Sequence, residues 1–214
     1  TRLQPRLNSR AIGVINGGQT AYFTDQEVAF GKRLAVTVAP RAILLCVFPE
    51  NDVIGNYYKH HHNVDVIDGY RLPKDRRLAV PAVDFLRTRS YLWKFIVHQH
   101  QSRTREARLA NYKRLAVEMP WELLRPTVEA FIELRHFCEE RGIRLGVVSI
   151  PSARKDPYGS PLKHALPRLE IPTFDLYQAG LGPEHRFAAD DHWNERGHAL
   201  ATRHLAPFCL ALLD

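Results

Sequence analysis

Cysteine is scarce in this sequence, with three in 214 residues. Cys46, Cys138 and Cys209 lie in apolar surroundings and lack the close paired spacing of a zinc site or a disulfide framework. We therefore expect buried thiols that act as small apolar residues, without a disulfide. The run His60–His62 does not indicate a metal either, because adjacent side chains point in different directions and a fixed third ligand is missing. No metal and no cofactor are predicted.

Long apolar runs are also missing, and none approaches the roughly 20 residues that a membrane-spanning helix needs. The first residues do not resemble a secretory signal, and the chain begins at Thr1 without an initiator methionine. We expect a processed or truncated product, whose targeting signal lay upstream, so the composition leaves the compartment open. Hydrophobic residues at 45% and charged residues at 25% are ordinary values for a folded soluble protein.

Acidic residues are outnumbered, since 30 Lys and Arg against 23 Asp and Glu give a net charge of +7. Much of the arginine lies within Arg71–Arg114. A basic face can attract nucleic acid, anionic polysaccharide or phospholipid headgroups. The strand pattern that stacks bases and the spacing of zinc fingers are both missing. The composition therefore favours a solvated basic helix surface over specific nucleic-acid binding, which we keep as a third hypothesis carried by Arg87–Arg114.

Apolar runs and helix signals alternate along the chain in a pattern typical of one α/β domain, with a mostly parallel sheet. Strands are expected at four apolar runs, at 11–16, 42–48, 143–150 and 171–176. Helices are expected where caps and periodicity agree, at 24–38, 81–114, 120–141, 161–169 and 195–213. Thr24-Asp25 and Asn194 are the expected N-caps of the first and last helices. Residues from about 55 to 80, rich in His, Tyr, Asp, Gly and Pro, are expected to form an irregular insertion.

The most informative stretch is Asp190-Asp191-His192-Trp193-Asn194, which enters the last helix. In extended backbone, Asp190 and His192 point to the same side. There the carboxylate can hold one imidazole nitrogen while the other nitrogen faces a substrate, as in the base half of a nucleophile–base pair. Taken alone, Asp190 is more often a capping acid and His192 a partly buried polar residue.

Two further polar turns follow predicted strands, Asn16-Gly17-Gly18 and Pro49-Glu50-Asn51-Asp52. Loops at the carboxyl ends of parallel strands converge on one crevice. An amide of Gly18 and the carboxamide of Asn51 could donate there to a developing oxyanion, each worth about 2.7–4 kcal/mol in barrier height. Read singly, each pair is simply a turn.

In this order, the three stretches resemble the blocks of the SGNH, or GDSL-like, hydrolase family. The resemblance implies a flavodoxin-like three-layer sandwich, the SGNH-hydrolase fold, over a single domain at 1–214. It further implies that Gly18 and Asn51 complete an oxyanion hole, that His192 is the general base, and that Asp190 orients it. The family's Gly-Asp-Ser nucleophile turn occurs nowhere in this chain.

Departures from the family pattern qualify this picture. Pro49 stands where the family usually has Gly, Glu50 puts a charge beside the proposed hole, and Asp191 adds a second acid. Ser149 and Ser152 are poor substitutes for the nucleophile, because neither lies in a tight glycine-rich turn. The nucleophile and its strand are therefore expected before Thr1, which would leave the domain N-terminally incomplete and the sheet without its first strand.

The function that the resemblance implies is that of a serine-type ester hydrolase or O-acyltransferase. Its expected substrates are short-chain acyl esters of small molecules or carbohydrates, and the resemblance slightly favours an extracytoplasmic or envelope location. The alternative is a non-catalytic SGNH-like binding or scaffold domain that has lost its nucleophile.

Overall fold

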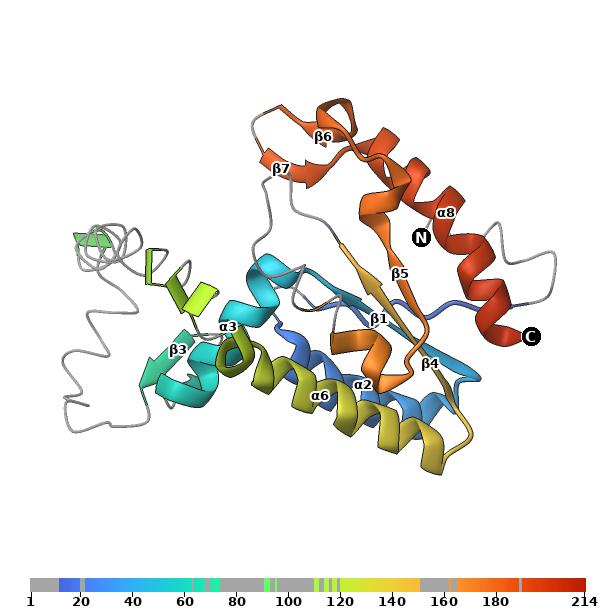
Figure 1. The fold of residues 1–214 in the computed structure, drawn as a ribbon, viewed down its shortest axis with the longest axis horizontal. Coiled ribbons are helices and arrows are strands. Elements are labelled where there is room, and N and C mark those ends of the chain that lie inside the picture. Colours follow the sequence, from blue (N-terminus) through green and yellow to red (C-terminus); the bar gives the residue numbers. More distant parts are fainter. Residues whose placement is uncertain are drawn as a thin grey trace.

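A three-stranded parallel sheet organises the described part of the chain (Figure 1). Its strands are β1 (Ala42–Val47), β4 (Arg144–Ser149) and β5 (Thr173–Asp175), in the spatial order β1-β4-β5. β1 and β4 pair along their whole length without a register shift. The three corresponding apolar runs are thus confirmed as strands, the last of them shorter than expected.

The structure, a computed structural model, describes the following residues: 12–19, 22–62, 64–67, 70–73, 91–92, 95, 110–111, 114–115, 117–118, 120–150, 162, 165–188 and 190–214. The helix expected at 81–114 lies mostly outside these residues, and those described within it are helical.

Helices cover both faces of the sheet. On one face lie α2 (Thr24–Val38) and α6 (Pro120–Glu140), while α8 (Glu195–Leu213) covers the other (Figure 1). Side-chain alternation along β1 explains this, because Leu45 and Val47 join the core under α6 and Leu44 packs on the α8 side. The result is a three-layer α/β arrangement compatible with a flavodoxin-like layout.

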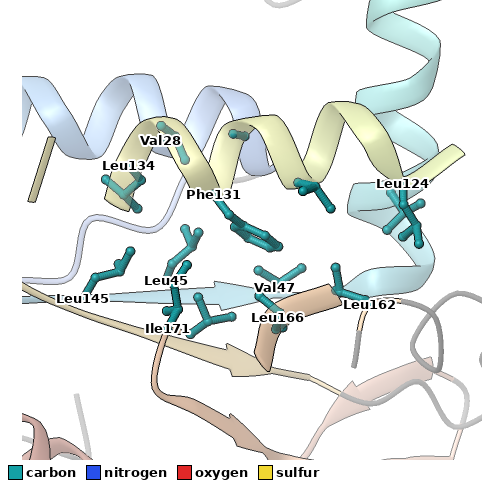
Figure 2. Packing of buried hydrophobic residues seen from close by; sticks show 14 of the residues in the cluster. Val28, Leu45, Val47, Leu124, Phe131, Leu134, Leu145, Leu162, Leu166 and Ile171 are labelled. Carbon is teal, nitrogen blue, oxygen red and sulfur yellow. The ribbon is translucent and has the colours of Figure 1, made fainter. Parts of the chain in front are cut away.

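The core between α6 and the sheet is formed by buried apolar side chains (Figure 2). Phe131, Leu134 and Val147 are at most 1% exposed, and Val28 of α2 closes the same cluster. On the opposite face, α8 approaches β4 so closely that a Cβ at Gly146 would come within 2.9 Å of Leu212.

The expected strand at 11–16 is wrong over the described residues 12–16, which have no regular structure. Ile15 is 62% exposed there. An apolar run becomes a strand only where a neighbouring edge takes its backbone hydrogen bonds, and no described strand pairs with this segment.

The irregular insertion expected at about 55–80 is also wrong over its described residues. Helix α3 (Pro49–His62) extends through its first part, and β2 (Val64–Ile67) with β3 (Tyr70–Pro73) forms an antiparallel hairpin. Val53, Asn56 and Tyr57 turn inward at helical spacing, a pattern hidden by the polar composition. The histidines at 60–62 consequently end a helix instead of lying in a loop.

Between β4 and α8, the described residues form short elements. Leu162 and Ala165 are helical within the region expected at 161–169, which closes with the 3-10 turn η2 (Leu166–Leu169). The remaining elements are η3 (Leu176–Ala179), η4 (Pro183–His185), β6 (Arg186–Phe187) and β7 (Asp190–Trp193). In the described part of the chain, no helix is long and apolar enough to cross a membrane.

The three cysteines are free thiols. Cys138 is buried as expected and Cys209 is partly buried, but Cys46 on β1 is exposed. The expectation for Cys46 is wrong, since among the described strands only β4 lies beside β1.

Candidate functional site

The ends of β1, β4 and β5 at Val47, Ser149 and Asp175 define the carboxyl edge of the sheet. α3 and η3 begin at this edge, directly after β1 and β5.

α8 runs antiparallel to the strands. The carbonyls of Leu213 and Leu212 in its last turn accept hydrogen bonds, both 3.1 Å long, from Arg41 and Arg144 at the amino ends of β1 and β4. The first turn of α8 therefore lies at the carboxyl edge (Figure 1), and β7, which carries His192, directly precedes it in the chain.

Asn194 caps α8, as its sequence position predicts. Its Oδ1 accepts the backbone N–H groups of Arg196 and Gly197, at 2.9 and 3.1 Å. Its Nδ2 donates to the carbonyls of Glu184 and Arg186, at 2.9 and 2.8 Å. One side chain thus fixes both the helix start and the loop that packs on it.

Gly197 brings this loop and the helix into direct contact. A Cβ at Gly197 would collide with the backbone carbonyl of His185, which accepts the N–H of Asn194 at 3.0 Å. Glycine at this position allows the close approach. The backbone next to His192 is consequently held by both cap and packing.

His192 lies on β7, which pairs with β6 in an antiparallel ribbon. The extended backbone expected for Asp190 to His192 is confirmed, but the register of β6 and β7 shifts between the pairs Arg186–Trp193 and Phe187–Asp190, so regular alternation of positions 190 and 192 stays a prediction. His192 is exposed, and the next residue, Trp193, packs its ring edge-on against His198 at 5.8 Å between centroids. The side chains of Asp190 and Asp191 lie outside the described part.

Asn51 occupies the first turn of α3, where the sequence suggested a plain turn. Its backbone N–H donates to the carbonyl of Phe48 at 3.0 Å, and its side chain is exposed. Pro49 suits the first position of the helix, because the missing N–H is not needed there. Asn51 therefore stands at the carboxyl edge, immediately after β1.

Gly18 lies in the irregular segment before α2. Its N–H donates to Oδ1 of Asn16 at 3.0 Å, so an oxyanion would have to replace that bond. The neighbouring Gly17 lies against Phe30 and Leu34 of α2. The role of Gly18 as an oxyanion donor stays a prediction.

Sequence reasoning missed a group of acids beside the carboxyl edge, formed by Asp25, Glu27 and Asp52, which we call the acid cluster. Burial raises the pKa of Asp52 to about 7, although a hydrogen bond from the Phe48 N–H, 2.7 Å long, lowers it. Burial, and then the charges of Asp52 and Asp25, raise the pKa of Glu27 to about 8. The helical spacing of Asp52 with the inward-facing Val53 and Asn56 was the available signal.

Asn56 supports the acid cluster from α3. It is fully buried, its Oδ1 accepts the backbone N–H of Asp25 at 3.3 Å, and its Nδ2 donates to Oγ1 of Thr127 at 2.8 Å. These bonds tie α2, α3 and α6 together next to the carboxyl edge.

Other candidate sites are less informative. Within the described residues, no three His, Cys, Asp or Glu side chains are grouped to hold a metal. A cavity of about 440 Å³ opens near the amino ends of β4 and β5, and its lining includes Arg135, Arg144, Glu170 and Phe208. It contains none of the predicted site residues.

Comparison with protein-family models, with curated proteins and with solved structures finds no match for this chain.

Proposed function

We propose that this chain is an SGNH-like serine esterase or O-acyltransferase domain, whose nucleophile comes from outside residues 1–214. The observation that carries the proposal is that the first turn of α3 and the β7–α8 junction share the carboxyl edge. Asn51 and His192 are thereby exposed on the same edge of a parallel sheet, where ligands of open α/β sheets bind.

The proposed reaction is acyl transfer through a covalent intermediate. A serine hydroxyl attacks the ester carbonyl as His192 accepts its proton, and the alcohol leaves with that proton. Water or a carbohydrate hydroxyl then attacks the acyl-enzyme and releases the serine. Asn51 and Gly18 would donate to the oxyanion, and Asp190 would orient His192.

The hydrogen bonds around Asn194 support the role of His192. A general base is effective when its position is fixed before the substrate arrives. The cap at Asn194 and the contact at Gly197 hold the backbone next to His192, a residue that is exposed.

The test uses the polypeptide extended by its native upstream sequence, assayed with p-nitrophenyl acetate. We expect His192→Ala to lower turnover by about 10²–10⁴-fold, the usual contribution of a general base. The exposed His136 on α6 provides the matched control, and His136→Ala should leave turnover unchanged. Equal rates for wild type and His192→Ala would refute the proposal, and absence of turnover would favour the non-catalytic alternative.

A further inference from the structure

The short strand β5 leaves part of β4 without a neighbour. β5 pairs with Val147–Ser149 only, whereas β1 pairs with β4 along its whole length. The residues of β4 before this pairing, Arg144–Gly146, therefore have a strand on one side alone within the described part of the chain. At this place the cavity of about 440 Å³ opens, with Cys138 of α6 and Leu212 of α8 among the residues that line it. We call this cavity the β4 notch.

The residues before β5 explain why the pairing stops there. The carbonyl of Pro172 accepts the N–H of Val147 at 2.9 Å, and Val147 is the first residue of β4 that pairs with β5. The preceding bond of a parallel ladder would join the carbonyl of Leu145 to the N–H of residue 172, and proline has no N–H. Glu170 adopts a left-handed conformation, with φ 52°, which turns the chain away from the extended path that a longer strand would need.

The peptide groups of Leu145 face the β4 notch. Backbone groups alternate along a strand, and the N–H of Arg144 donates to the carbonyl of Arg41 on the β1 side at 3.0 Å. The N–H and C=O of the next residue, Leu145, therefore point to the other side, where this residue lines the notch. No described residue hydrogen-bonds with either group. The notch thus offers one backbone donor and one backbone acceptor, which proteins normally pair.

Apolar side chains form the walls of the β4 notch. They include Ile171 and Cys138 from the core under α6, and Phe208 and Leu212 from α8. Burial, and then the charge of Glu139, raise the pKa of the Cys138 thiol to about 11, so the thiol is neutral and acts as part of the apolar wall. Because the notch continues the plane of the sheet between two helical layers, it suits a flat molecule with two apolar faces.

The arginines that line the β4 notch already have partners. Arg135 donates to Oε1 of Glu139 at 2.6 Å, and its Nη2 lies 3.6 Å from Oε2 of Glu170. Arg144 donates to two carbonyls at the end of α8, at 3.1 and 3.3 Å. An anion would compete with the acids for these arginines, and a cation would compete with the arginines for the acids. The lining therefore favours an uncharged ligand.

We propose that the β4 notch binds an uncharged, planar small molecule that carries a hydrogen-bond acceptor next to a donor, as lactams, cyclic ureas and nucleobases do. The acceptor takes the N–H of Leu145, and the donor binds the carbonyl of the same residue. The ring faces pack on the apolar walls, and the volume of the notch lies within the range of small-ligand pockets. The notch lies at the amino ends of the strands, so this site is separate from the proposed function at the carboxyl edge.

NMR measurements on residues 1–214 test the proposal. In the free protein, the amide of Leu145 should exchange with solvent at least about tenfold faster than that of Val147, which donates to Pro172. The probe is isoquinolone, a flat bicyclic lactam, which should shift the Leu145 amide signal with a Kd of roughly 1 mM, the affinity expected for its size. Its N-methyl derivative keeps the ring but lacks the donor, and should bind at least about fivefold more weakly.

Ala211 provides a variant that fills the β4 notch without disturbing the core. It lines the cavity and is exposed on α8, so Ala211→Phe should fold and should abolish the shift of the Leu145 amide. Ala199 is the matched control, because it is an exposed alanine nearer the start of the same helix and does not line the cavity. Ala199→Phe should bind the probe as the wild type does.

Several results would overturn the site. A Leu145 amide that exchanges as slowly as that of Val147 would mean that its backbone is already paired. Absence of a shift with the probe, or an equal shift in Ala211→Phe, would place any binding elsewhere. Equal affinity for the lactam and its N-methyl derivative would refute recognition by the Leu145 carbonyl. None of these readouts depends on esterase turnover, so failure of the proposed function would leave this site intact.

Discussion

Asp52 is a carboxylic acid held in a poor environment for its charge. It is 4% exposed, and burial raises its pKa from 3.8 to about 7. Burial is also the main reason why the pKa of Glu27 is raised to about 8. A carboxyl whose pKa is higher in the folded state favours folding less as it ionises. The contribution of these two acids to stability should therefore be largest below about pH 4 and decline as pH rises from there to about 8.

Asp52→Asn should flatten this decline, because the amide carries no charge and its oxygen can still accept the Phe48 N–H. Thermal melts between pH 4.5 and 8.5 measure the effect. Glu133→Gln, at an exposed acid on α6, should keep the wild-type slope. A slope for Asp52→Asn as steep as that of the wild type would contradict the burial of the Asp52 carboxyl.

Asn194 combines two roles that substitution can separate. Asn194→Ala removes the cap of α8 and both bonds to the loop, and should cost about 1–2 kcal/mol in the free energy of unfolding. Asn194→Asp keeps the Oδ1 acceptor but loses the Nδ2 donor, so it should cost less while still loosening the loop at Glu184 and Arg186. Urea denaturation ranks the variants, and equal losses would show that the loop bonds carry the stability.

At the scale of elements, two glycines test how α2 and α3 pack. A Cβ at Gly55 would overlap the ring of Phe23, whereas Gly31, inside α2, has no atom within 4 Å of that position. Gly55→Ala should destabilise by about 1–3 kcal/mol through overpacking. Gly31→Ala should stabilise by about 0.5–1 kcal/mol, because alanine suits helices better. Chemical denaturation of both variants checks the prediction, and a neutral Gly55→Ala would mean that the helices are not in close contact.

Elements differed in how far their own residues predicted them. β1, β4, α6 and α8 follow from apolar runs, periodicity and caps, all set by residues a few positions apart. α3 was missed because its polar residues were interpreted by composition, and its helical face is recognised once Val53 and Asn56 have α2 and α6 to pack against. The N-cap of α2 is Phe23, one residue earlier than expected, with Gln26 Oε1 accepting its N–H at 3.2 Å.

At the scale of the whole molecule, the core under α6 unites α2, α6, β1 and β4. Phe131 is fully buried at its centre (Figure 2), so Phe131→Ala should cost about 3–5 kcal/mol through the cavity it leaves. Trp121 on the same helix is 58% exposed, and Trp121→Ala should stay within about 0.5 kcal/mol. Calorimetry compares the two, and similar melting temperatures would contradict this core.

The candidate site shows the same division between local and distant effects. The extended backbone before α8 and the cap at Asn194 were predicted from adjacent residues, and both are confirmed. That α8 begins at the carboxyl edge, directly after His192, follows from the contacts of its far end with Arg41 and Arg144. No short stretch of sequence contains that information.

What the sequence by itself determined is the α/β class, the buried parallel strands and the helix ends, because these follow from interactions within about one helical turn or along one strand. Only the tertiary structure decided that residues 12–16 form no strand, that Cys46 is exposed, and that the partly buried Glu27 and the buried Asp52 have raised pKa values. Strand pairing and desolvation depend on groups distant in the chain, and these come together only when the layers pack.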